Sequence, residues 1–461
     1  MSTTVLTRWE PEDQAFWQTK GARIAYRNLC ISIPALMLAF VVWMLWSVVA
    51  VNLDRAGFHF TGNQLFWLTA LPALSGATLR IFYSFLVPIF GGRRFTAIST
   101  ALLMIPALGM GFALRDPTTG YPTLLMLALL CGLGGANFSS SMANISFFFP
   151  KARKGLATGL NAGIGNLGVS VVQFLTPVVI SVAVFGALGG DGQQYQANGV
   201  TRDLWLQNAG FIWVPFIAVS ALAAWFGMHD IADARASFAE QAVIFKRPHN
   251  WLMCWLYVGT FGSFIGFSAG LALLTKSQFP DVNPTAYAFL GPLVGALTRP
   301  VGGWLSDKLG GARVTLWSFL GMIGGVVAVL SALPHPGTGG SFVGFLAAFI
   351  ALFALTGIGN GSTFRMIPVI FLTERQRAAK GRDAAAQRQA LQDAAKESAA
   401  VLGFSGAIGA YGGFFIPKSF GTSLEMTGTP DAALYAFILF YISCAVITWW
   451  CYARRNAAMP C

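Results

Sequence analysis

Two arginines at equivalent places in a repeated stretch are the residues of this chain best suited to bind a charged molecule. The first copy is GATLRIFYSFLVPIFGGRR, residues 76–94, and the second is GALTRPVGGWLSDKLGGAR, residues 295–313. Aligning the copies pairs Arg80 with Arg299. An arginine keeps its charge at physiological pH, and its planar fork of N–H donors matches the oxygens of a small oxyanion. The two residues therefore indicate a site for such an anion.

Each of these arginines lies inside a long apolar run, where a charge is costly. A charged side chain at mid-membrane depth costs at least about 3 kcal/mol unless it faces a cavity or a partner. The interiors of the runs carry no Asp or Glu, and the four histidines lie in connections or at the ends of runs. A bound anion is the simplest counter-charge, with waters or backbone carbonyls as the alternative. The missing proton carriers favour exchange of one anion for another over proton coupling.

The composition places the chain in a membrane. Its 461 residues are 55% hydrophobic and only 10% charged, whereas soluble domains carry about 25% charged residues. An apolar run of roughly 20 residues predicts a membrane-spanning helix, and the chain has twelve such runs. The predicted spans cover residues 31–53, 63–87, 95–114, 122–149, 155–186, 207–228, 251–275, 284–304, 314–333, 341–372, 398–424 and 432–453.

Lysine and arginine decide the expected orientation. They concentrate in the N-terminal segment, the even-numbered connections and the C-terminal tail, and they are sparse in the odd-numbered connections. Cytoplasmic loops are enriched in these residues, so we expect both termini in the cytoplasm. The formal net charge of +12 then reflects topology and contact with anionic lipid, and nucleic acid is not an expected partner.

A second repeat shows that the chain consists of two related halves. GLNAGIGNLG, residues 159–168, aligns with GFSGAIGAYG, residues 403–412. The predicted organisation is an N-terminal six-helix half at 1–228, a cytoplasmic linker at 229–250 and a C-terminal six-helix half at 251–461. Such a parallel duplication resembles the major facilitator architecture, in which the substrate binds near the midplane between the halves.

The glycines of this second repeat predict close helix packing. Small residues three or four positions apart give a helix a smooth face against which another helix can pack and slide. We expect six glycines to serve packing and gating: Gly163, Gly165 and Gly168 in the first copy, and Gly406, Gly409 and Gly412 in the second. Polar residues on the same stretches, Asn161, Asn166 and Ser405, favour a place for this face on the substrate cavity.

Aromatic residues complete the candidate pocket. The fourth span contains GGANFSSSMANISFFFP with Phe138, and the seventh contains LYVGTFGSFIGFSAG with Tyr257 and Phe261. A flat anion can be held between ring faces while its oxygens accept hydrogen bonds in the plane. A packing role is the alternative for each ring.

Two further features are expected to lie outside the pocket. Arg365 stands about two turns from the cytoplasmic end of the tenth span, which favours snorkelling or loop contacts over substrate contact. Residues 373–397 are rich in Ala, Gln, Arg and Asp and predict a surface helix or a flexible loop. Neither a metal-ligand cluster nor a nucleophile–base pair stands out in the spans, so no metal, no cofactor and no enzymatic activity are expected.

Together these motifs resemble the NarK-like nitrate/nitrite porter family of the major facilitator superfamily. The resemblance covers nearly the whole chain, and its most specific elements are the two glycine-rich stretches and the strings SGATLRIFYSF and GALTRP. It implies an all-α polytopic membrane protein with the major facilitator fold, twelve transmembrane helices and two pseudo-symmetric six-helix halves. It also implies that Arg80 and Arg299 clamp the anion, Phe138 and Phe261 sandwich it, and Tyr257 and nearby Asn side chains add hydrogen bonds.

The strings match most closely the branch that exchanges nitrate for nitrite, so the expected substrates are these two anions and the expected assembly is a monomer. The superfamily loop signature is intact in GWLSDKLG, residues 303–310, but Ser84 and Pro88 replace its Gly and Asp in the first half. This departure puts a salt bridge from the first loop in doubt. A proton-coupled nitrate symporter, a porter for another small anion such as phosphate, and a membrane nitrate sensor acting through residues 373–397 remain alternatives.

Overall fold

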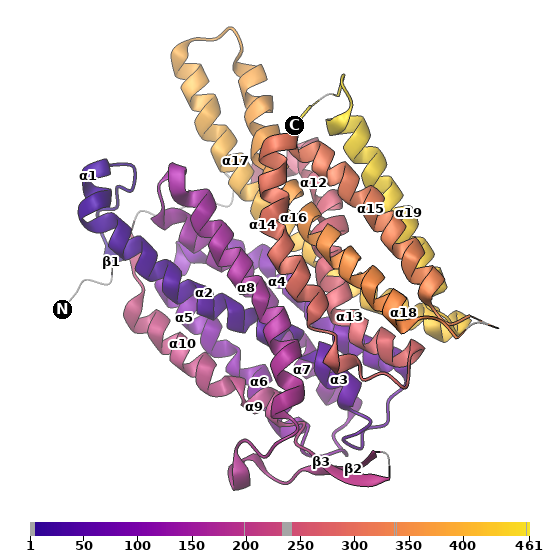
Figure 1. Cartoon of the computed structure of the whole chain (residues 1–461). Helices are drawn as coiled ribbons and strands as arrows, with labels where there is room; N and C mark the ends of the chain where they lie inside the picture. Colours follow the sequence, from indigo (N-terminus) through magenta and orange to yellow (C-terminus); the bar gives the residue numbers. More distant parts are fainter. Residues whose placement is uncertain (1–4, 198, 233–241, 336, 338, 458) are drawn as a thin grey trace. The chain divides into compact units, whose positions relative to one another are not determined.

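The long apolar runs fold into α-helices (Figure 1). The computed structural model describes residues 5–197, 199–232, 242–335, 337, 339–457 and 459–461. Within them, eleven segments are long and apolar enough to cross a membrane. The helix that matches the remaining predicted span, α14 (Leu290–Leu309), contains Arg299 and two prolines and is less apolar. The expected all-α class is confirmed.

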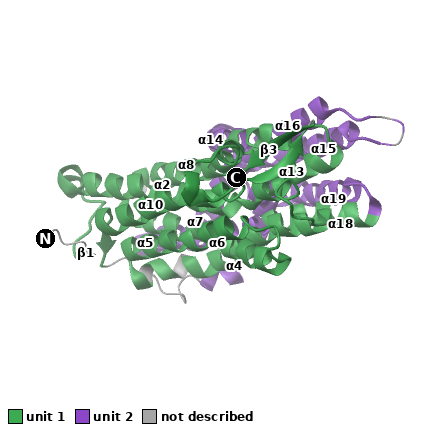
Figure 2. Cartoon of the chain, turned by 90° about the horizontal axis from the view of Figure 1, so that it is seen from below, with its two compact units in different colours: residues 1–235, 268–293, 413–426 green, residues 236–267, 294–412, 427–461 purple. Residues whose placement is uncertain are grey.

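The chain divides into two compact units (Figure 2). The first comprises residues 1–235, 268–293 and 413–426, and the second comprises residues 236–267, 294–412 and 427–461. The predicted half boundaries at 228 and 250 stay a prediction, because helices of the later half contribute segments to the first unit.

The first unit contains most helices of the N-terminal half and two short strand pairs. Its helices are α1 (Gln14–Phe16), the π-helical turn η1 (Trp17–Gly21), α2 (Ala22–Met44), α3 (Trp46–Asn52), α4 (Gly62–Phe90), α5 (Gly92–Leu102), α6 (Met104–Ala113), α7 (Tyr121–Phe148), α8 (Lys151–Val179), α9 (Asn208–Phe211) and α10 (Trp213–Gly227), with the 3-10 turns η2 (Gly186–Gly189) and η5 (Pro284–Ala286). Its strands are β1 (Val5–Leu6), which pairs in parallel with β4 (Asp230–Ile231), and β2 (Gln193–Ala197), which pairs antiparallel with β3 (Val200–Leu204).

The helices from residue 242 onward belong to the second unit except for residues 268–293 and 413–426, which belong to the first. They are the 3-10 turn η3 (Ala242–Lys246), α12 (Pro248–Tyr257), the π-helical turn η4 (Val258–Gly262), α13 (Ser263–Gln278), α14, α15 (Gly311–Ala332), α16 (Phe342–Ala379), α17 (Ala384–Ala410), α18 (Gly412–Thr427), α19 (Asp431–Thr448) and the π-helical turn η6 (Trp449–Ala453). Parts of α13, α14 and α18 belong to the first unit.

The Gly-Gly pairs of the first repeat end two equivalent helices. Gly91 stands between α4 and α5 with φ of 84°, and Gly310 stands between α14 and α15 with φ of 89°. A side chain with a Cβ is strained at such a φ, whereas glycine adopts it readily. The repeat therefore produces the same sharp turn at the C-terminal end of the helix that contains Arg80 and of the helix that contains Arg299.

The predicted fifth span is too long at its C-terminal end. It was expected to reach residue 186, but α8 ends at Val179. Asn208 of α9 donates hydrogen bonds from its side-chain amide to the carbonyls of Val179 and Val182. These carbonyls lie at the helix end, where the backbone has no helical partners of its own. The apolar run continues past Val179, so apolar length alone does not show where α8 ends. The hydrogen bonds from Asn208 mark that end in the structure.

Residues 373–397 form the facing ends of two long helices and a turn between them. Helix α16 runs on to Ala379, and α17 begins at Ala384; Figure 1 shows this hairpin, with α17 labelled. Three alanines of this hairpin are buried: Ala379, Ala390 and Ala394. Their small side chains let the two helices pack closely. Of the two expected forms, the helical one is confirmed.

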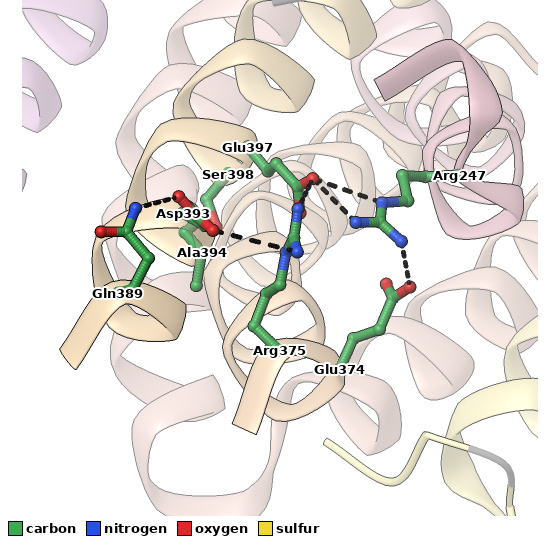
Figure 3. A network of polar contacts seen from close by, with 8 residues as sticks. All are labelled: Arg247, Glu374, Arg375, Gln389, Asp393, Ala394, Glu397 and Ser398. Carbon is green, nitrogen blue, oxygen red and sulfur yellow. Dashed lines mark hydrogen bonds and ion pairs between the residues drawn. The ribbon is translucent and has the colours of Figure 1, made fainter. Parts of the chain in front are cut away.

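A network of charges fixes this hairpin (Figure 3). Glu397 of α17 is buried and accepts hydrogen bonds from the guanidinium groups of Arg247 and Arg375. Arg247 also pairs with Glu374 at 3.2 Å, and Arg375 lies 3.9 Å from Asp393. Two cations around one buried carboxylate satisfy a charge that would be costly alone. The end of the linker, α16 and α17 are thereby held together.

Candidate functional site

Arg80 of α4 is fully buried and held by aromatic rings. Its Nε donates a hydrogen bond of 2.7 Å to the backbone carbonyl of Gly135 in α7. Its guanidinium carbon lies 4.8 Å from the centre of the Trp43 ring and 4.8 Å from that of Phe138. Ring faces carry negative charge density that attracts a cation. The ring faces of Trp43 and Phe138 and the carbonyl of Gly135, which come from α2 and α7, thus orient the cation.

Glycines in α7 permit this approach. A Cβ on Gly132 or Gly135 would collide with Ser75 of α4 or with the Trp43 ring, and one on Gly134 would collide with the backbone of Ala39 in α2. The Trp43 ring is fixed because its Nε1 donates to the carbonyl of Pro72 at 2.8 Å. The string GLGGANF therefore brings α2, α4 and α7 close together, and it places both the carbonyl and the ring that contact Arg80.

Arg299 of α14 has an analogous environment in the second unit. It is 8% exposed, its guanidinium carbon lies 5.3 Å from the centre of the Phe364 ring, and its Nη2 donates to the Tyr257 hydroxyl at 3.5 Å. Its Nη1 has no hydrogen-bond partner among the residues that the structure describes. A buried guanidinium N–H of this kind can donate a hydrogen bond to an oxygen of an anion without giving up an existing bond.

Tyr257 and Phe261 form a stack beside this arginine's partner ring. Their ring centres are 5.4 Å apart with an interplanar angle of 19°, and Phe261 stacks in turn with Phe264. The centre of the Tyr257 ring also lies 5.8 Å from the centre of the Phe364 ring. The π-helical turn η4 separates α12 from α13 at these positions. The structure thus brings Arg299, Tyr257 and Phe261 into one cluster.

Phe364 was missed by the sequence analysis. It follows the run GNGST, residues 359–363, and small and polar residues inside a span often line a helix interface or a cavity. That run also contains Asn360, which is buried and whose Oδ1 has no hydrogen-bond partner within the described part of the chain. The run was the available signal for both residues.

The first glycine-rich stretch lies on α8 and combines packing with polar groups. Gly165 and Gly168 leave no room for a Cβ, which would meet Leu36 and the Met37 carbonyl of α2, while a Cβ on Gly163 would meet nothing within 4 Å. Asn161 donates to Ser141 Oγ at 2.8 Å. The Oδ1 atoms of Asn161 and Asn166 are buried and have no hydrogen-bond partner among the described residues.

The second glycine-rich stretch packs against the Tyr257–Phe261 segment. A Cβ on Gly409 would press on the Tyr257 ring, and one on Gly412 would collide with Gly262 of η4. Gly406 is buried in α17, and Ser405 is buried with its Oγ 3.6 Å from Cys254 Sγ. This stretch thereby positions the aromatic stack beside Arg299. The gating role of the six glycines stays a prediction.

Arg365 makes the loop-end contact that was expected of it. Its Nε donates to Asp307 at 2.6 Å, and both side chains are about half exposed. Asp307 belongs to the intact loop signature. The described residues contain no group of three or more His, Cys, Asp and Glu side chains that could hold a metal ion.

The chain is similar to known membrane transporters over nearly its whole length. Residues 32–417 match the model of the Major Facilitator Superfamily. The chain is 54% identical to the nitrate/nitrite transporter NarU of Escherichia coli strain K12, over 99% of this chain and 97% of NarU. It is 42% identical to the probable nitrate/nitrite antiporter NarK2 of Thermus thermophilus, over 99% of this chain and 98% of that protein.

A solved structure shows the same fold. A bacterial homologue of the human lysosomal transporter Spinster, in an inward-facing and occupied conformation, matches with a TM-score of 0.60 and 13% sequence identity. The match covers 93% of this chain and 96% of that one. The fold, the family match and the identity to named transporters lead to one assignment: the chain belongs to the NarK-like nitrate/nitrite porter family of the Major Facilitator Superfamily.

Proposed function

We propose that this chain exchanges nitrate for nitrite across a bacterial inner membrane, with the anion held between Arg80 and Arg299. The observation that supports it best is the burial of one arginine in each unit, each held by aromatic rings, in spans without an interior carboxylate. Relatives named as nitrate/nitrite transporters and as a probable nitrate/nitrite antiporter support the choice of substrates.

In this mechanism the two arginines supply charge and in-plane hydrogen bonds. The planar fork of each guanidinium suits a planar oxyanion. Phe138 and Phe261 cover the faces of the anion, and Tyr257, Asn161, Asn166 and Ser405 are the proposed polar contacts. Such a site holds nitrate and nitrite by the features that they share, which are flatness and negative charge.

Exchange follows from the electrostatics of the empty site. Two guanidinium charges repel each other strongly in a medium of low dielectric constant. The carrier would therefore resist closing around an empty site, and a bound anion would remove that barrier. Return of the carrier then needs a counter-anion, which is the condition for obligatory exchange. The halves rock around the site, and the glycine faces of α8 and α17 are the proposed sliding surfaces.

Both termini are proposed to lie in the cytoplasm, because Lys and Arg concentrate in the segments that would then be cytoplasmic. A monomer is the proposed functional unit, since one chain carries both arginines. Labelling of single cysteines introduced at Arg8 and at Arg202 from either side of right-side-out vesicles would test the orientation. Labelling of the Arg8→Cys variant from outside the vesicles would contradict a cytoplasmic N-terminus.

Counterflow in proteoliposomes tests the exchange. Uptake of labelled nitrite should require nitrate or nitrite inside the vesicles and should not respond to an imposed pH gradient. Rapid uptake into vesicles without an internal anion would exclude obligatory exchange. Uptake that rises with an inward proton gradient would instead favour the proton-coupled symporter.

A further inference from the structure

A basic pocket lies at the N-terminal end of α2, apart from the buried arginines. It has a volume of about 240 Å³ and is lined by Thr19, Lys20, Arg23, Ile24, Arg27 and His229. Lys20, Arg23 and Arg27 follow one another at about one helical turn and are exposed, so they share one face. The lining contains three cations and no acidic residue. Its chemistry suits an anion with several oxygens.

His229 adds a fourth donor with a fixed orientation. The side-chain amide nitrogen of Asn28 lies 3.3 Å from His229 Nδ1, and the backbone N–H of His229 donates to Asn28 Oδ1 at 2.9 Å. An amide nitrogen can only donate, so Nδ1 accepts and Nε2 carries the ring proton. Asn28 is completely buried, which holds the imidazole in place at the pocket.

The pocket adjoins an apolar surface of α10. Leu222, Trp225 and Phe226 are large apolar residues near the end of this helix, and all three are exposed. A Cβ on Gly227, the last residue of α10, would lie 3.8 Å from Arg27 Nη2. The cations of α2 therefore begin where the apolar surface of α10 ends. Headgroup-binding sites have this combination of basic pocket and acyl-chain surface.

We propose that this pocket binds the phosphate of an anionic phospholipid in the cytoplasmic leaflet, with the acyl chains lying against α10. Lys20, Arg23 and Arg27 supply the charge, and His229 Nε2 donates to a phosphate oxygen. This inference rests on the cytoplasmic orientation proposed above and is independent of the transported anion.

A bound lipid would tie the first span to the start of the linker. His229 precedes Asp230, whose carboxylate accepts a 2.8 Å hydrogen bond from the backbone N–H of Arg93 at the start of α5. Asp230 also pairs with the Arg93 side chain at 3.3 Å, and both are buried. The occupant would therefore contact α2 and the segment that holds the first turn of α5.

Lipid binding to the purified full-length chain in nanodiscs tests the proposal. The discs contain phosphatidylcholine with or without phosphatidylglycerol, and bound lipid is counted by native mass spectrometry. We expect the double variant Arg23→Gln, Arg27→Gln to lose the preference for phosphatidylglycerol by roughly tenfold or more. The matched control, Arg382→Gln with Arg388→Gln, removes two exposed charges from the α16–α17 hairpin and should keep that preference.

Three outcomes would overturn the lipid assignment. They are an unchanged preference in the double variant, an equal loss in the control, and displacement of phosphatidylglycerol by millimolar inorganic phosphate, which would make the pocket a soluble-anion site. Anion exchange by the double variant is measured in parallel. Loss of lipid preference with exchange retained would separate this pocket from the transport site, and absence of exchange in the parent chain would bear only on the proposed function.

Discussion

The guanidinium carbon of Arg80 lies 4.8 Å from the centre of the Phe138 ring, and the two residues come from adjacent helices, α4 and α7. The same α7 supplies the carbonyl of Gly135 to Arg80 Nε. The ring and the carbonyl that contact this buried cation thus come from residues three positions apart on α7.

Replacing either buried arginine by lysine should slow anion exchange strongly. Arg80→Lys and Arg299→Lys keep the charge but lose the planar pair of donors. Losing about 3 kcal/mol of charge-assisted hydrogen bonding corresponds to roughly 100-fold slower uptake. Counterflow of labelled nitrite at a fixed protein density measures the rate of uptake. Arg388→Lys, on the exposed hairpin, is the control, and uptake by both site variants at the parent rate would rule out the clamp.

Adding one methyl group should distinguish packed from unpacked glycines on α8. In Gly168→Ala the new Cβ collides with the Met37 carbonyl of α2, so we expect a loss of about 1–3 kcal/mol of stability. In Gly163→Ala it meets open space, so stability should stay the same or rise slightly. Thermal unfolding in detergent measures both. Equal melting temperatures for the two variants would contradict the packing assigned to Gly168.

Removing the charge of Glu397 should destabilise the hairpin. In Glu397→Gln, Arg247 and Arg375 lose their shared carboxylate, and we expect a cost of roughly 2 kcal/mol. Asp393→Asn is the matched control, because Asp393 is partly exposed and lies 3.9 Å from Arg375; its cost should stay below about 1 kcal/mol. Limited proteolysis at the 380–383 turn would report the loosening, and identical cleavage rates would argue against a structural role for the network.

Acidification should destabilise the chain through His229 in detergent without anionic lipid. Burial, followed by the charges of Arg27, Arg93 and Lys20, lowers the pKa of His229 from its usual value near 6.5, and Asp230 opposes this only in part. The unfolded chain therefore binds this proton more readily than the folded chain. Stability should be greatest above the usual pKa and should fall as the pH drops below it.

Melting temperatures between pH 5 and pH 8 test this effect. The parent chain should lose more stability on acidification than His229→Gln, whose side chain cannot take up the proton. Phosphatidylglycerol should reduce the difference, because a bound anion favours the imidazolium. Parallel pH profiles for parent and variant would contradict the prediction.

The sequence alone determined the features that depend on type and spacing along one helix. Apolar length predicted the spans, and the repeated stretch predicted that Arg80 and Arg299 occupy equivalent places in two related halves. Arg80 and Arg299 stood out because a charged side chain inside an apolar run is costly. These are local rules, and the order of residues suffices to apply them.

The tertiary structure decided which groups meet those arginines and where some helices stop. Phe364 beside Arg299, the Gly135 carbonyl beside Arg80 and the Asn208 cap at the end of α8 all come from other helices. The spans are apolar on most faces, so periodicity does not reveal how each helix is rotated about its axis. That rotation is set by packing at glycines and by side-chain hydrogen bonds between helices, which exist only once the chain has folded.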